Sequence, residues 1–231
     1  MTVLSVARDS LSALALGYAF LCGSAAGAEY KLEPLKDKPP AEVSGPLGEA
    51  LPAAGFRLLD KKGMPLVDVW LRKEIPAAPS KKPPPGIKFE EVSEGTFLGV
   101  ARFHQKHFDF KNKPIPSGTY TLRLGVQPSD GDHLGVSETR DFALLSPAAA
   151  DKSLAPMPTS EVVKMSCQVS GTKHPAVLWL KPMSGDAKDL PALVHQEDRE
   201  YEVLDFRLPL AGEKEKAARL GLVLVGTAPD A

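Results

Sequence analysis

The stretch Thr119-Tyr120-Thr121-Leu122-Arg123-Leu124-Gly125-Val126 decides the fold class of this chain. Its large side chains (Tyr120, Leu122, Leu124 and Val126) alternate with Thr119, Thr121, Arg123 and Gly125. In an extended strand this period of two places each set on one face. The preceding residues 113–118 carry two prolines and a glycine, which is the chemistry of a turn. We therefore expect a strand that starts from a turn.

The same period of two recurs along the rest of the chain. In residues 66–72, Val67, Val69 and Leu71 share one face and Asp68, Trp70 and Arg72 the other, the pattern of a half-buried strand. Further strands are expected at 56–60, 87–92, 96–103, 141–145, 161–169, 176–181, 201–208 and 220–225. Only residues 212–219 suit a short helix. These patterns predict an all-β fold, a β-sandwich of roughly nine or ten short strands.

The N-terminal region has the plan of a signal peptide. Residues 11–22 are nearly all apolar or small, and Ala26-Gly27-Ala28 supplies the small residues that a signal peptidase needs. The apolar run of about 12 residues is shorter than the roughly 20 of a membrane span. The alternative is a buried N-terminal helix. We expect cleavage after Ala28, a mature chain that begins at Glu29, export to the periplasm or outside the cell, and no membrane span after cleavage.

The mature chain divides by composition into four parts. Residues 29–53 carry five prolines and mixed charge, and we expect an extended arm or linker. Residues 54–146 form the first half of the β-sandwich, and 147–160, rich in Ala, Pro and Ser, form a connection. Residues 161–231 form a second β half that packs on the first, or a small second β domain. Cleavage leaves Cys167 as the sole cysteine, expected as a buried small side chain on the strand 161–169.

The first half resembles a known class of β-sandwich. Residues 56–69 carry a strand, the turn Asp60-Lys61-Lys62-Gly63-Met64-Pro65-Leu66 and a second strand, and residues 116–124 carry a Pro-x-Gly-x-Tyr-x-Leu strand. These motifs resemble carboxypeptidase-regulatory-like and transthyretin-like modules, which implies an immunoglobulin- or transthyretin-like first half. The whole chain is also similar to exported bacterial proteins of unknown function that share the segments at 120–123 and 131–135. That resemblance implies compartment and fold, and no activity.

The loop 127–135 contains the first group of candidate site residues. Asp130 and Asp132 offer carboxylate oxygens and His133 a ring nitrogen, just after the predicted strand that ends at Val126. Loops held by a rigid scaffold often bind ligands, so these three residues are candidates for a ligand or a divalent metal ion. The alternative is a structural turn, in which the aspartates bond the backbone and Gly131 and Gly135 adopt positive φ.

His104 and His107 form the second candidate, with His133 as a third metal ligand if the fold brings the three together. Two histidines at this spacing chelate a transition metal where the segment turns, whereas on a continuing strand they point to opposite faces. The alternative is an ordinary exposed strand end. We therefore expect no cofactor, with a divalent metal ion as the alternative.

The remaining motifs favour binding over catalysis. We find no nucleophile elbow, zinc signature or phosphate-binding loop. The net charge is −1 and the basic residues are dispersed without interleaved aromatics, so no nucleic-acid partner is expected. We expect a non-enzymatic accessory or binding protein of the cell envelope, whose partner is another envelope protein or a carbohydrate. The alternative is a metal-dependent or hydrolytic enzyme that uses the Asp130-Asp132-His133 loop.

Overall fold

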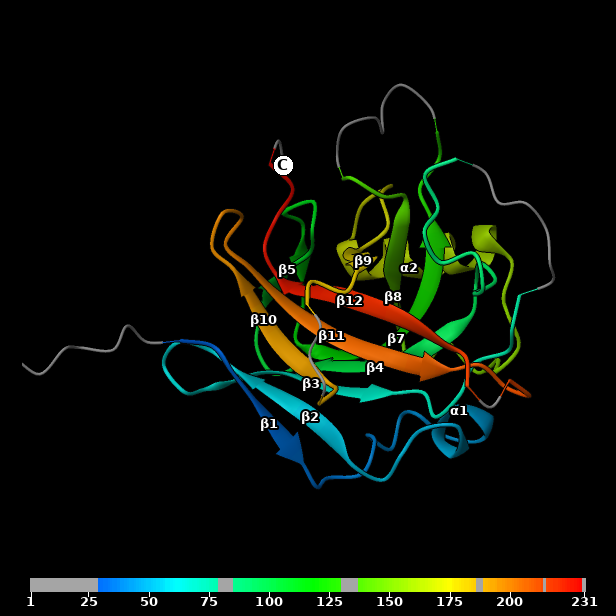
Figure 1. Cartoon of the computed structure of the whole chain (residues 1–231), viewed down its shortest axis with the longest axis horizontal. Helices are drawn as coiled ribbons and strands as arrows, with labels where there is room; N and C mark the ends of the chain where they lie inside the picture. Colours follow the sequence, from blue (N-terminus) through cyan, green and yellow to red (C-terminus); the bar gives the residue numbers. More distant parts are fainter. Residues whose placement is uncertain (1–28, 79–84, 130–136, 186–188, 214, 230–231) are drawn as a thin grey trace, which may run out of the picture.

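The computed structural model describes residues 29–78, 85–129, 137–185, 189–213 and 215–229. Its main feature is one antiparallel sheet (Figure 1). In spatial order the ten strands are β1 (Lys31–Leu35), β2 (Gly55–Leu59), β3 (Pro65–Leu71), β4 (Phe97–Phe103), β7 (Gly118–Val126), β8 (Asp141–Pro147), β9 (Val177–Pro182), β12 (Ala217–Val225), β11 (Tyr201–Pro209) and β10 (Ala192–Gln196). The other elements are a small hairpin of β5 (His107–Phe108) and β6 (Pro114–Ile115), and the helices α1 (Pro46–Glu49) and α2 (Thr159–Ser170).

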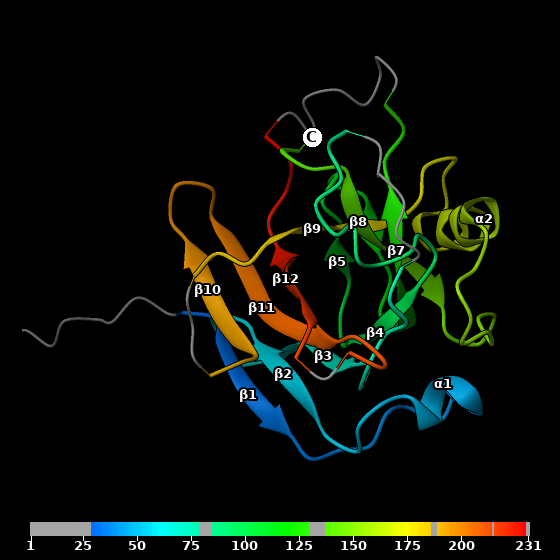
Figure 2. The same ribbon diagram turned by 45° about the vertical axis from the view of Figure 1, so that its right-hand side comes forward.

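The sheet curls until its two edge strands approach each other. β1 and β10 are the ends of the hydrogen-bonded order, yet their Cα atoms come within 8 Å. Figures 1 and 2 both show the two strands close together across an open seam. The all-β prediction is confirmed, and the opposite walls of one nearly closed sheet enclose the core. The two halves of the chain are continuous in this sheet, because β8 pairs with β9.

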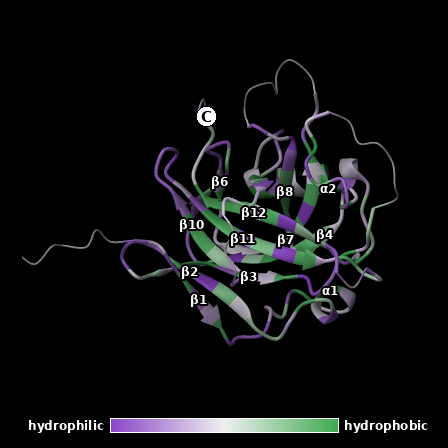
Figure 3. Cartoon of the chain, in the orientation of Figure 1, coloured by the Kyte–Doolittle hydropathy of each residue, from purple (hydrophilic) through white to green (hydrophobic). Residues whose placement is uncertain are grey.

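The largest apolar cluster lies inside the curled sheet. On β7, Tyr120, Leu122 and Leu124 belong to this cluster, so the alternation that identified the strand is confirmed. The apolar residues in Figure 3 follow the strands, whereas polar residues gather at the hairpin ends. At about 25 cal/mol per Å² of apolar surface, this interior supplies the main stabilisation of the fold.

The outer face of the sheet is also covered, in two places. Residues 35–51, including α1, pack Leu47 and Leu51 against Trp70 of β3 and Phe97 of β4. The helix α2 packs on β8 and contributes Val162 to a second outer cluster. The expectation of a half-buried strand at 66–72 was therefore wrong, because the covering segment buries the second face of β3 as well.

Several predicted elements differ in the structure. Residues 161–169 belong to α2, residues 87–92 hold only an isolated bridge at Val92, and residues 212–219 are a turn followed by the start of β12. The expected arm at 29–53 contains β1, which pairs with β2 along its whole length, and α1. The strand β10 was not predicted. β1 pairs with β2 and α2 packs on β8, and the local sequence pattern does not show these distant partners.

Candidate functional site

A hollow of about 470 Å³ opens at one end of the nearly closed sheet. It lies between the β10–β11 hairpin, the end of β12, the strand β5 and the turn that joins β2 to β3. We call it the mouth site and define it by six of its lining residues: Tyr30, Lys61, His107, Phe108, His195 and Glu202. Ligand sites are common at the open ends of closed sheets, because the walls are rigid and the strand ends present different side chains.

His195 and Glu202 form a close pair in the mouth site. They are direct cross-strand neighbours in the β10–β11 hairpin, with 2.8 Å between His195 Nδ1 and Glu202 Oε1. The carboxylate accepts, so Nδ1 carries the hydrogen and Nε2 is the nitrogen that this bond leaves unused. Glu202 is buried at 4% exposure, whereas the His195 side chain is 48% exposed. A buried carboxylate therefore orients a ring that a ligand can reach.

His107 is held in one tautomer by the backbone. Its Nε2–H donates to the carbonyl oxygen of Leu224 at 2.7 Å, and its ring stacks on Phe103 at 5.1 Å between centroids. Burial lowers the pKa of His107 below 6.5, and the bond to the carbonyl offsets only part of this effect. The ring is therefore neutral at pH 7, and its Nδ1 is a hydrogen-bond acceptor.

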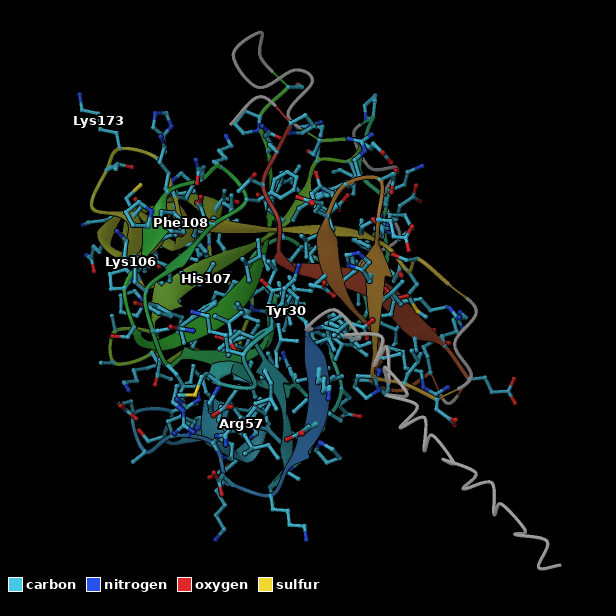
Figure 4. The ribbon with its side chains drawn as sticks, turned by 90° about the vertical axis from the view of Figure 1, so that its left-hand side faces the viewer. Tyr30, Arg57, Lys106, His107, Phe108 and Lys173 are labelled. Atoms are coloured by element: carbon cyan, nitrogen blue, oxygen red, sulfur yellow. The ribbon has the colours of Figure 1, made fainter. Side chains whose placement is uncertain are left out.

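The two aromatic residues of the mouth site come from different elements (Figure 4). Tyr30 lies just before β1, with Lys61 Nζ 5.5 Å from its ring centroid. Burial, followed by the charges of Glu202 and Asp60, raises the pKa of Tyr30 above 10.0, so the hydroxyl keeps its proton and is a donor. Phe108 on β5 is 45% exposed, an unusual position for a large apolar ring.

The hollow continues along the seam between β1 and β10. A neighbouring hollow of about 510 Å³ shares Tyr30, Lys61, His195 and Glu202 with the mouth site. A third, of about 520 Å³, shares Tyr30 and Leu193 with the second. The space is therefore elongated, and it is suited to a ligand longer than a single small ring.

The charges that line the mouth site are of both signs. Glu197, Glu200 and Glu202 are acidic, and Lys61 and Arg199 are basic. With His107 neutral, no single sign dominates. Strongly charged ligands gain little from such a lining, whereas neutral groups that both donate and accept hydrogen bonds are well matched to it.

The predicted site residues lie in different places. Asp130, Asp132 and His133 fall outside the described residues. His107 is part of the mouth site, whereas His104 Nε2 lies 2.8 Å from Oδ2 of Asp68 on the outer face of the sheet. Within the described part of the chain, no group of three His, Cys, Asp or Glu side chains is arranged to hold a metal ion.

Asp68 is the centre of a charged ladder across three strands. It is fully buried, and its cross-strand neighbours are Arg57 on β2 and Arg102 on β4. Both guanidinium groups donate to its carboxylate, with 2.7 Å from Arg57 Nε, and His104 adds a third partner. These hydrogen bonds satisfy the buried Asp68 carboxylate, so His104 has a structural role as one of its partners.

Sequence reasoning missed His195 and Glu202. His195 lies two residues before the hairpin turn 197–200 and Glu202 lies two residues after it. This symmetry is visible only once β10 is known to pair with β11. The residues of β10 are mostly half buried and show no alternation, so the sequence did not indicate this strand.

No protein-family model, curated protein or solved structure matches this chain. The resemblance to transthyretin-like modules therefore stays a prediction. Among the described residues, no helix has the length and apolar character that crossing a membrane requires.

Proposed function

We propose that this chain is a non-enzymatic binding protein exported to the cell envelope, and that its ligand occupies the mouth site. The observation that carries the proposal is the elongated hollow along the β1–β10 seam, which joins aromatic rings to fixed hydrogen-bonding groups. Pockets of several hundred Å³ with a few oriented polar groups are the usual form of ligand sites.

The lining favours a neutral, hydroxyl-rich ligand of the saccharide class. Tyr30 and Phe108 bring two aromatic rings to this lining, and such rings pack on the C–H face of a sugar. A lysine ammonium lies over one face of each ring, Lys61 over Tyr30 and Lys106 over Phe108. The exposed ring of His195 offers its Nε2, the neutral His107 offers its Nδ1 as an acceptor, and the Tyr30 hydroxyl offers a donor. A chain of sugar units fits an elongated groove better than a compact ligand does.

Isothermal titration calorimetry tests this function with chitotetraose, cellotetraose and maltotetraose as probes, and with the chain that begins at Glu29. We expect one tetrasaccharide to bind, and Glu202→Gln to weaken that binding about tenfold by removing the charge that orients His195. Glu213→Gln, outside the mouth site, is the matched control and is expected to bind as the parent does. Absence of binding by all three probes contradicts the saccharide class.

The export part of the proposal has its own measurement. Mass spectrometry of the protein from periplasmic or extracellular fractions should show an N-terminus at Glu29. An abundant form that retains Met1 contradicts it, whatever the result of the titrations.

The enzyme expected from the Asp130-Asp132-His133 loop lies outside the described residues, but the mouth site suggests a different hydrolytic arrangement. The Glu202 carboxylate orients the His195 imidazole, which is also the arrangement of a general base. Glu197, Glu200 and Glu202 also line the hollow, and a pair of carboxyl groups is what most glycoside hydrolases use. Chromatography of the bound tetrasaccharide after long incubation separates the two functions. We expect it intact; cleavage that His195→Asn abolishes establishes the enzyme instead.

A further inference from the structure

A separate hollow, of about 270 Å³, lies between α2 and the outer face of the sheet. Figures 1 and 2 show α2 against this face, beside β7 and β8. We call this hollow the α2 groove. Its apolar lining includes Gly125 of β7, Phe142 and Leu144 of β8, Val163 of α2 and Val177 of β9. It shares no lining residue with the mouth site, so it is a separate site.

Gly125 sets the shape of the α2 groove. A Cβ atom at this position would lie 2.3 Å from Leu144 Cδ1, so any other residue would push the Leu144 side chain out of its place in the groove lining. Leu144 is 5% exposed and packs in the outer apolar cluster. The missing side chain on β7 therefore leaves room for the apolar lining in its present position.

The described lining of the α2 groove has two lysines, Lys111 and Lys173, together with His174 and no acidic residue. Glu94 and Asp109 accept hydrogen bonds from the backbone N–H groups of the lining residues Val126 and Val177. Lys173 and His174 are exposed in the turn that follows α2, and Figure 4 shows Lys173 extending from the edge of the molecule. A narrow apolar slot with a cationic rim is complementary to a ligand that has an apolar tail and an anionic head.

We propose that the α2 groove binds the acyl chain of a single-chain amphiphile with an anionic headgroup. The chain packs against Phe142, Leu144 and Val163, and the headgroup lies at the rim near the exposed Lys173. Apolar burial supplies the affinity, and Lys173 selects the sign of the headgroup. This site is independent of the ligand in the mouth site.

Calorimetric titration with decanoate tests the proposal in the chain that begins at Glu29. We expect one molecule to bind, octanoate to bind about fourfold more weakly for each methylene it lacks, and decyltrimethylammonium not to bind. Absence of decanoate binding, or equal binding of the cationic amphiphile, overturns the proposal.

Variants locate the binding. Val163→Trp fills the groove and should abolish decanoate binding. Lys173→Glu should weaken it about tenfold, whereas Lys164→Glu, the same charge change at an exposed position of α2 that does not line the groove, should leave it unchanged. A thermal melt checks that each variant is folded. If Val163→Trp fails this check, the two lysine variants decide: equal weakening by both overturns the proposal.

Discussion

Arg123 and Asp151 are both fully buried, and together they fix the connection after β8 to the outer face of β7. Arg123 Nε lies 2.6 Å from Asp151 Oδ2, and its Nη1 donates to the carbonyl oxygen of Gly95 at 2.7 Å. The other guanidinium nitrogen donates to Asp151 Oδ1 and to the carbonyl oxygen of Ser153. Because the guanidinium nitrogens of Arg123 all have acceptors, directed hydrogen bonds hold this buried group in place together with the opposite charge of Asp151.

We expect Asp151→Asn to lower the free energy of unfolding by about 3–5 kcal/mol, because it leaves the Arg123 guanidinium buried without its counter-charge. Urea unfolding measures the change. Lys216→Ala removes an exposed pair with Glu213 and serves as control, with an expected loss of less than about 0.5 kcal/mol. Equal losses in the two variants would contradict the importance of the buried pair.

Asp68 predicts a pH dependence of stability. Burial alone would raise its pKa, but the hydrogen bonds from Arg57, Arg102 and His104 outweigh burial and hold the pKa below 3.8. A depressed folded pKa means that the contribution is complete above the ordinary value and is lost as the pH falls through the folded value. The advantage of the parent over Asp68→Asn should therefore shrink as the pH falls below about pH 4.

Urea unfolding at several pH values measures this advantage, expected at about 2–4 kcal/mol at pH 7. Asp37→Asn is the matched control, because the Asp37 side chain is 66% exposed and its Oδ2 lies 4.0 Å from Nη2 of Arg57, which also bonds Asp68. Its effect should stay within about 0.5 kcal/mol at every pH. An advantage of Asp68 that grows as the pH falls below about pH 4 would contradict the depressed pKa.

At the scale of elements, α2 shows how a sequence pattern misleads. Val163, Met165, Cys167 and Val169 alternate with polar residues and predicted a strand, whereas the buried positions Val162, Ser166 and Val169 follow the spacing of a helix. Ser166 is the reason that this spacing was missed, since its hydroxyl donates to the carbonyl oxygen of Ala176 at 2.9 Å. A buried serine satisfied by a distant backbone group leaves no trace in the local sequence.

The helix changes the expectation for Cys167. It is partly exposed rather than buried on a strand, and burial raises the pKa of its thiol above 9.0. In the chain that begins at Glu29 it is the sole thiol. We expect a thiol reagent to modify the native protein, more slowly than the unfolded protein, because less of the thiol is ionised and reachable. A spectroscopic thiol assay with and without urea measures both rates, and complete protection of the native thiol would contradict it.

Whether Cys167 matters for stability is a separate measurement. Cys167→Ala should cost less than about 1 kcal/mol, whereas Val162→Ala, on the buried face of the same helix at 1% exposure, should cost about 1–3 kcal/mol. Urea unfolding of the two variants gives both values. The reverse order would place Cys167 on the packed face.

At the scale of the whole molecule, the sequence predicts those elements whose structure depends on residues adjacent in the chain. The strand 119–126 was predictable because one of its faces is continuously apolar and a proline turn precedes it. β10 was not, because all but His195 of its residues are half buried and no alternation marks it. The His195–Glu202 pair depends on that strand and its register, so the candidate site was hidden with it.

The closure of the sheet is the property that the sequence indicates least, and β1 provides its test. Leu35 is buried at 6% exposure, and Tyr30 and Leu32 pack against the inner core from the edge of the sheet. A chain that begins at Lys36 lacks this strand and one wall of the seam. We expect it to unfold at least about 2 kcal/mol more easily than the chain from Glu29, since the burial of Leu35 alone contributes roughly that much.

Truncation also removes Tyr30 from the mouth site, so saccharide binding should be lost while decanoate binding at the α2 groove persists, provided that the shortened chain still folds. Urea unfolding and calorimetry measure the two effects. Glu33→Ala, an exposed position on β1, is the control for a change in the strand that keeps its pairing, with an effect within about 0.5 kcal/mol. If residues 29–35 were instead a free linker, both truncated and full mature chains would unfold at the same urea concentration, and the seam would not be part of the fold.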